Sequence, residues 1–129
     1  NLNDHPNGNL RWSYRGNLNR ADLEEHGQGT CNAWLTTGFN DVFEFTAPIA
    51  GTYVFETFSI GATDTIMWVR SLCGSEGGAA EIGCNDEEPG MPDSAVTAAG
   101  LQAGQTVYIF VDSSGANWRG RYDLKARRQ

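Results

Sequence analysis

The sequence predicts an all-β fold, an antiparallel β-sandwich of about seven to eight strands. Two observations favour this fold class. Valine, isoleucine and aromatic residues cluster in short runs, and turn-forming, glycine-rich stretches separate these runs. No strand pattern alternates with a helical pattern, as βαβ units would require. At 129 residues the chain has the length of one ordinary domain, which is long enough to bury a core.

The first 29 residues are polar, and we separate them from a sandwich that spans residues 30–129. The sequence leaves open whether this segment packs on its own sandwich or exchanges with another copy. Leu10, Trp12 and Tyr14 alternate as one face of a short strand. Asn19 to His26 suits a helical turn instead, since Asn19 can cap it.

Two turns are each flanked by a pair of strand patterns, and each predicts a β-hairpin. Residues 42–46 and 52–58 flank Ala-Pro-Ile-Ala-Gly, and residues 94–99 and 107–111 flank Leu-Gln-Ala-Gly-Gln. The unbroken apolar run at 107–111 predicts a central strand that is covered on both faces. The last strand, 122–126, places Tyr122, Leu124 and Ala126 toward the core.

The strand pattern at 65–70 alternates around Arg70, which is expected to mark the solvent side. Met67 and Val69 then point inward, and Ile66 and Trp68 share the solvent side with Arg70. Trp68 is therefore expected to be partly exposed, where its ring could contact a partner.

The formal charge of −7 argues against a nucleic-acid partner, because phosphate backbones require a basic surface. The charge is uneven, since five basic residues and one acid after position 114 give +4 and leave −11 on the rest. Apolar runs are far shorter than the roughly 20 residues of a membrane span.

Cys73 and Cys84 flank a segment rich in Gly, Ser and Glu that suits an exposed loop. We expect a loop-closing disulfide between them, which implies an oxidising compartment. Cys31 is left over. A zinc site is disfavoured because the sequence holds no C-x-x-C and no closely spaced Cys/His pair.

The segment around residues 85–88 offers only oxygen ligands, which suit calcium. No EF-hand spacing is present, so such a site would be assembled from separate loops, and a solvated acidic loop is the alternative. The candidate ligands are Asp64, Asn85, Asp86, Glu87 and Asp93.

Six phrases, in order and spacing, resemble the bacterial pre-peptidase C-terminal domain family over about residues 30–126. They are DVFEFTAP at 41–48, AGTYVFET at 50–57, DTIMWVR at 64–70, CNDE at 84–87, LQAGQTVYIFVD at 101–112 and GRYDL at 120–124. The resemblance implies a jelly-roll-like or immunoglobulin-like sandwich, appended to secreted bacterial hydrolases or built into surface proteins. It implies no catalytic residues, and it makes calcium and polymer binding expectations to test.

The chain departs from the family pattern in two places. Family members often carry a cysteine where Phe58 stands, so Cys31 is expected to lack a partner within the chain. The final loop, usually bland, holds Trp118 beside Arg119 and Arg121, which together with Trp68 are our candidates for partner contact.

We expect no enzymatic activity, because the sequence holds neither an H-E-x-x-H pair nor a G-x-S-x-G elbow. No third group can be named to orient a Cys31–His26 pair, and nothing selects two carboxylates for glycoside hydrolysis. The leading expectation is an accessory or adhesive module of a secreted or surface bacterial protein, which binds an extracellular polymer or protein surface. The alternatives are a subunit of a self-assembling surface structure and a module that binds polysaccharide or collagen.

Overall fold

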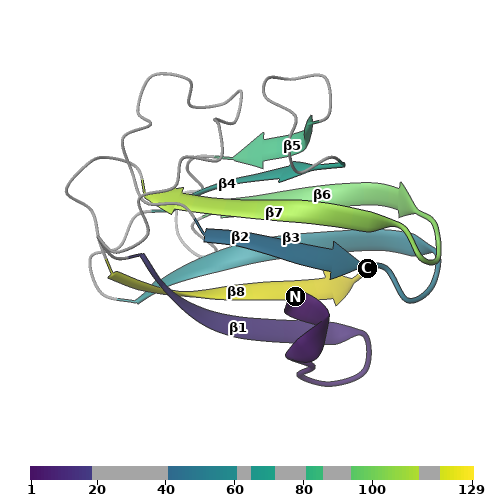
Figure 1. The fold of residues 1–129 in the computed structure, drawn as a ribbon, viewed down its shortest axis with the longest axis horizontal. Helices are drawn as coiled ribbons and strands as arrows, with labels where there is room; N and C mark the ends of the chain where they lie inside the picture. Colours follow the sequence, from purple (N-terminus) through teal and green to yellow (C-terminus); the bar gives the residue numbers. More distant parts are fainter. Residues whose placement is uncertain (19–40, 61–64, 72–80, 86–93, 114–119) are drawn as a thin grey trace.

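The computed structural model describes residues 1–18, 41–60, 65–71, 81–85, 94–113 and 120–129. Within them, two four-stranded antiparallel sheets pack face to face, which confirms the predicted sandwich (Figure 1). Sheet A has the order β1 (Arg11–Leu18), β8 (Gly120–Arg128), β3 (Gly51–Ile60), β6 (Ser94–Leu101). Sheet B has the order β2 (Asp41–Thr46), β7 (Thr106–Ser113), β4 (Thr65–Arg70), β5 (Glu81–Asn85).

The strand pairing is that of a jelly roll. Each strand of the first half of the chain pairs with one of the second half in reverse order: β1 with β8, β2 with β7, β3 with β6, and β4 with β5. The chain is thus a long antiparallel ribbon, rolled so that successive pairs fall alternately in sheets A and B. The jelly-roll alternative therefore holds, and the immunoglobulin-like one does not.

Both predicted hairpins are wrong. β2 and β3 lie in different sheets, as do β6 and β7, so the two turns carry the chain from one sheet to the other. The turns hold each other in place, because Ala47 N–H donates to the Gln105 carbonyl at 2.9 Å and Gly104 N–H to the Ala47 carbonyl at 2.8 Å. A turn motif marks a reversal of the chain, but it does not specify whether the next strand returns to the same sheet.

The core lies between the sheets and follows the predicted alternation. Met67 and Val69 are buried there, and so are Tyr122, Leu124 and Ala126 of the central strand β8. Aromatic rings fill its middle: Phe45 meets Trp12, Tyr53 and Phe55 edge to face, with centroids 4.8, 5.3 and 5.3 Å away. Each such contact is worth about 0.5–1.5 kcal/mol beyond the area that it buries.

The polar N-terminal residues are part of the sandwich. The predicted short strand is confirmed as β1, which pairs with β8 along its whole length. Before it, the 3-10 helix η1 (Leu2–Asp4) buries Leu2, and the Asn3 side chain exchanges two hydrogen bonds of 2.8 and 2.9 Å with the backbone of Thr46. The predicted turn at 19–26 and the domain boundary after residue 29 lie outside the described residues.

The expected exposure of Trp68 is wrong. Ile66, Trp68 and Arg70 do share the face of sheet B that points away from the core, but they are at most 1% exposed. The Arg70 guanidinium carbon lies 4.9 Å from the Phe110 ring centre, and Trp68 stacks parallel to Phe110 at 5.4 Å. An arginine can be buried against aromatic faces, so its presence did not mark the solvent side.

Strand β5 was not predicted, because its five residues include Gly83 and hold one large aliphatic side chain, Ile82. It pairs with β4 at the edge of sheet B, with Cys84 opposite Trp68. Among the described residues, no helix has the length and apolar character needed to cross a membrane.

Candidate binding face on sheet A

The residues predicted for partner contact are not brought together by the described structure. Arg121 is exposed on β8, in sheet A, whereas Trp68 is buried on β4, in sheet B. A ring that is 1% exposed offers no platform for a partner. Trp118 and Arg119 lie outside the described residues.

Of the predicted calcium ligands, the structure describes Asn85, which ends β5 and is half-buried opposite Met67. Asp64, Asp86, Glu87 and Asp93 lie outside the described residues. The described part of the chain has no group of three or more His, Cys, Asp or Glu side chains placed to hold a metal. The calcium site therefore stays a prediction.

Cys84 is disulfide-bonded, and its partner cysteine is not among the described residues. Cys31 and Cys73 both lie outside them. The Cys73–Cys84 pairing stays a prediction.

Sheet A presents five of its basic side chains on one face, the one turned away from the core. Because side chains alternate along a strand, the polar phase of β1 and β8 falls on this face while Trp12, Tyr122 and Leu124 fill the core. Arg11 pairs across the strands with Arg127, Ser13 with Lys125, and Arg15 with Asp123. The next strand, β3, adds Glu56 opposite Lys125. We call this the basic face; its charged residues are Arg11, Arg15, Glu56, Arg121, Asp123, Lys125 and Arg127.

Both acids of the basic face are already paired. Arg15 Nε lies 3.0 Å from Asp123 Oδ1, and Arg127 Nε lies 3.1 Å from Glu56 Oε1. The hydrogen bond to Asp123, and secondarily its charge, raise the pKa of Arg15. Three cations of the basic face have no ion pair with a described residue: Arg11, Arg121 and Lys125.

The basic face is opposite in sign to the whole protein. Five cations and two anions give it a formal charge of +3, whereas the chain carries −7, so the remainder carries −10. It holds five of the nine Lys and Arg residues of the sequence, and all five side chains are exposed. Such a surface attracts anionic groups.

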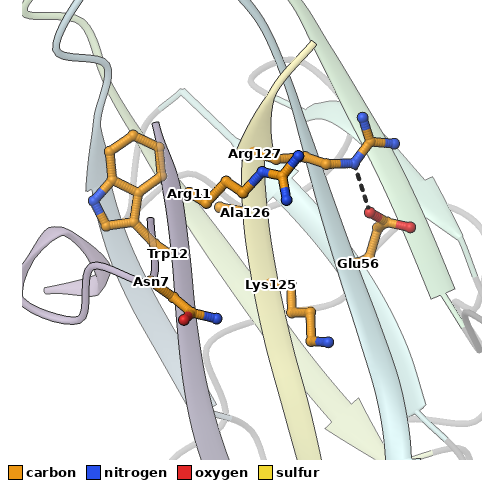
Figure 2. A pocket seen from close by; sticks show the side chains of 7 residues that line it. All are labelled: Asn7, Arg11, Trp12, Glu56, Lys125, Ala126 and Arg127. Carbon is orange, nitrogen blue, oxygen red and sulfur yellow. Dashed lines mark hydrogen bonds and ion pairs between the residues drawn. The ribbon is translucent and has the colours of Figure 1, made fainter. Parts of the chain in front are cut away.

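A hollow of about 340 Å³ opens beside β1 and β8 at the basic face (Figure 2). Figure 2 shows Arg11 reaching from β1 toward β8, while Arg127 turns away to its ion pair with Glu56. The lining residues are Asn7, Arg11, Trp12, Glu56, Lys125, Ala126 and Arg127. With two unpaired cations and an amide at its wall, the hollow can bind an anion.

The sequence identified half of this surface. Arg121, Lys125 and Arg127 belong to the predicted basic end of the chain, but Arg11, Arg15 and Glu56 were missed. The alternation that assigned Trp12 and Tyr14 to one face also places Arg11 and Arg15 on the other, so a signal was present. The alternation did not show that β1 pairs with β8, and this pairing joins residues from opposite ends of the chain.

No family model matches this chain, and no curated protein matches it. Solved structures do. A periplasmic inhibitor of g-type lysozyme from Aeromonas hydrophila, PliG, aligns over 95% of this chain and 89% of its own, with 17% identity and a TM-score of 0.57. The pre-peptidase C-terminal domain of a collagenase from Bacillus anthracis aligns over 92% and 90%, with 13% identity and a TM-score of 0.57. Similarity at such low sequence identity shows a shared fold and nothing finer. The second of these structures supports the fold that the family resemblance implied.

Proposed function

We propose that this chain is a non-catalytic binding module that works outside the cytoplasm, in a secreted or surface-attached protein, and that the basic face is its docking surface. The observation that carries the proposal is the concentration of five cations on one exposed sheet face of a protein whose net charge is −7. Fold stability does not call for this arrangement, because Arg11 stands directly opposite Arg127 and like charges across a strand pair are destabilising.

Binding accounts for the face better than catalysis does. Its two carboxylates, Glu56 and Asp123, are each held by an arginine, which leaves neither free to act as a general base. The structural neighbours support the same direction, since one is an inhibitor of an enzyme and the other a domain appended to one. Their periplasmic and collagenase contexts also support a location outside the cytoplasm.

Two finer features belong to the same proposal. Calcium bound by the 85–88 segment with Asp64 and Asp93 would stabilise the module outside the cell, where calcium is abundant. A Cys73–Cys84 disulfide would suit the same compartment. The calcium site is supported by the side chains of this segment, which offer only oxygen ligands. The disulfide is supported by the disulfide-bonded state of Cys84.

Ion exchange tests the docking surface. From its sequence pI of about 4.6 alone, the protein should flow through a sulfonate cation exchanger at pH 7. If the basic face acts as a separate surface, the exchanger should instead retain the protein at low salt. The variant Arg11→Ala/Lys125→Ala should elute earlier. The control Gln102→Glu/Ala103→Glu makes the same change in net charge at an exposed turn, and it should elute with the wild type. Flow-through of the wild type, or equal losses in both variants, would overturn the proposal.

A further inference from the structure

We infer that the hollow beside β1 and β8 is a carboxylate-binding site, and that its occupant is an Asp or Glu side chain on an acidic protein surface. The inference rests on the proposed function, since it names the partner chemistry of the same basic face. Arg11 and Lys125 are the anchoring cations, and the Asn7 amide is a further donor at the wall. Together they form the part of the face where positive charge is least compensated.

The local charge balance comes from the ion pairs. The hollow contains its own acid, Glu56, but Arg127 occupies that carboxylate at 3.1 Å. Arg11 makes no ion pair with any described residue, and the Lys125 ammonium lies 4.7 Å from the centre of the Phe58 ring. Two positive charges therefore border the hollow without a neutralising partner from the described chain.

The pairing of the two strands places Arg11 and Lys125 near each other on one sheet face. Arg11 and Lys125 come from paired strands and are offset by two residues in the register, because Arg11 faces Arg127 and Ser13 faces Lys125. Diagonal neighbours on one sheet face are about 7–8 Å apart at the backbone, which long side chains span easily. Trp12 and Ala126 of the same two strands also line the hollow.

The charge pattern favours a protein surface over an extended polyanion. A long uniform polyanion would run past the basic face onto the remainder of the chain, which carries −10 and repels it. Glu56 and Asp123 also interrupt the cations, so the face complements a surface of mixed charge with a few prominent acids. A guanidinium binds a carboxylate through two parallel hydrogen bonds, which suits Arg11 to a single Asp or Glu side chain.

The test uses a fluorescein-labelled hexaglutamate peptide and measures its anisotropy with the full chain at low ionic strength. We expect saturable binding that weakens as salt is added, and no binding of a hexaglutamine peptide. Arg11→Ala and Lys125→Ala should each weaken binding by about tenfold, the loss expected for one charged hydrogen bond. Arg11→Lys should lose less, because the charge remains and the forked geometry does not.

Gln102→Glu/Ala103→Glu is the matched control, and its affinity should equal that of the wild type. No variant should lose more than a few degrees of melting temperature, since the altered side chains are exposed. If the exchanger retains the protein but hexaglutamate does not bind, the carboxylate site is overturned. The proposal that the basic face is a docking surface would then still stand. Tighter binding of a heparin oligosaccharide of equal charge would overturn the carboxylate site too, in favour of a polyanion, as would hexaglutamate binding that ignores both anchoring residues.

Discussion

Gly16 shows how a single missing side chain shapes sheet A. It stands opposite Tyr122 in the β1–β8 pair, and a Cβ built there would lie 2.3 Å from Tyr122 Cζ. Tyr122 is fully buried, and its hydroxyl donates a hydrogen bond to Asp41 Oδ2 on β2. The tyrosine therefore lies over the glycine and reaches across to the other sheet.

Gly16→Ala should lower the free energy of unfolding by about 1–3 kcal/mol, because the methyl group pushes Tyr122 from its place in a closely packed interior. Urea denaturation measures the effect. Asn17→Ala is the control, since Asn17 is exposed on the same strand and should change stability little. If the Gly16→Ala and wild-type proteins unfold at the same urea concentration, the Tyr122 ring is not held where we describe it.

At the scale of elements, the pair β4–β5 joins strands that are consecutive in the chain. Trp68 of β4 faces Cys84 of β5, so the cysteine lies at the edge of sheet B beside the buried aromatic pair. A bond from Cys84 to Cys73 would close the β4–β5 connection, whereas a bond to Cys31 would tie this edge to a more distant part of the chain.

Peptide mapping of the non-reduced protein should recover Cys73 linked to Cys84, with Cys31 as a free thiol. Closing a loop of this length contributes about 3 kcal/mol on the chain-entropy model, so reduction should lower the melting temperature. A peptide that contains Cys31 linked to Cys84 would contradict the pairing. In that case Cys73 would be the cysteine that reacts with iodoacetamide.

Strand positions were predictable from sequence, but strand partners were not. Apolar patterns identified β1, β2, β3, β4, β6, β7 and β8; β7 stood out by its unbroken apolar run rather than by alternation. The burial of Arg70 and Trp68 was missed, since alternation does not show whether the second face of a sheet is covered. The basic face was predicted in part, because Arg121 and Lys125 are close in sequence whereas Arg11 joins them through non-local pairing.

For the molecule as a whole, the separation of charge is the main electrostatic feature. The acids outside the basic face give that part of the chain a charge of −10, and like charges this dense oppose compaction. A bound divalent cation would relieve part of this repulsion, which links the calcium proposal to global stability and not to one loop.

Calcium should therefore raise the melting temperature, because the folded state would bind it and the unfolded chain would not. Differential scanning fluorimetry in calcium and in EGTA measures the shift, with Asp86→Ala as the variant that should lose it. Magnesium at equal concentration controls for general screening of charge. Equal melting in calcium and EGTA would show that the acidic segment does not bind the ion.

The rolled ribbon also determines when this protein can fold. β8 is formed by residues 120–128 and lies between β1 and β3, so sheet A has no continuous centre until the end of the chain is available. Such distant pairings make folding slow, on the order of milliseconds to seconds for β-sandwiches. During export through a membrane channel, an emerging chain would have to remain unfolded until its last strand arrived. Truncation by even one terminal strand would then remove the partner of β1 and leave an aggregation-prone edge instead of a smaller domain.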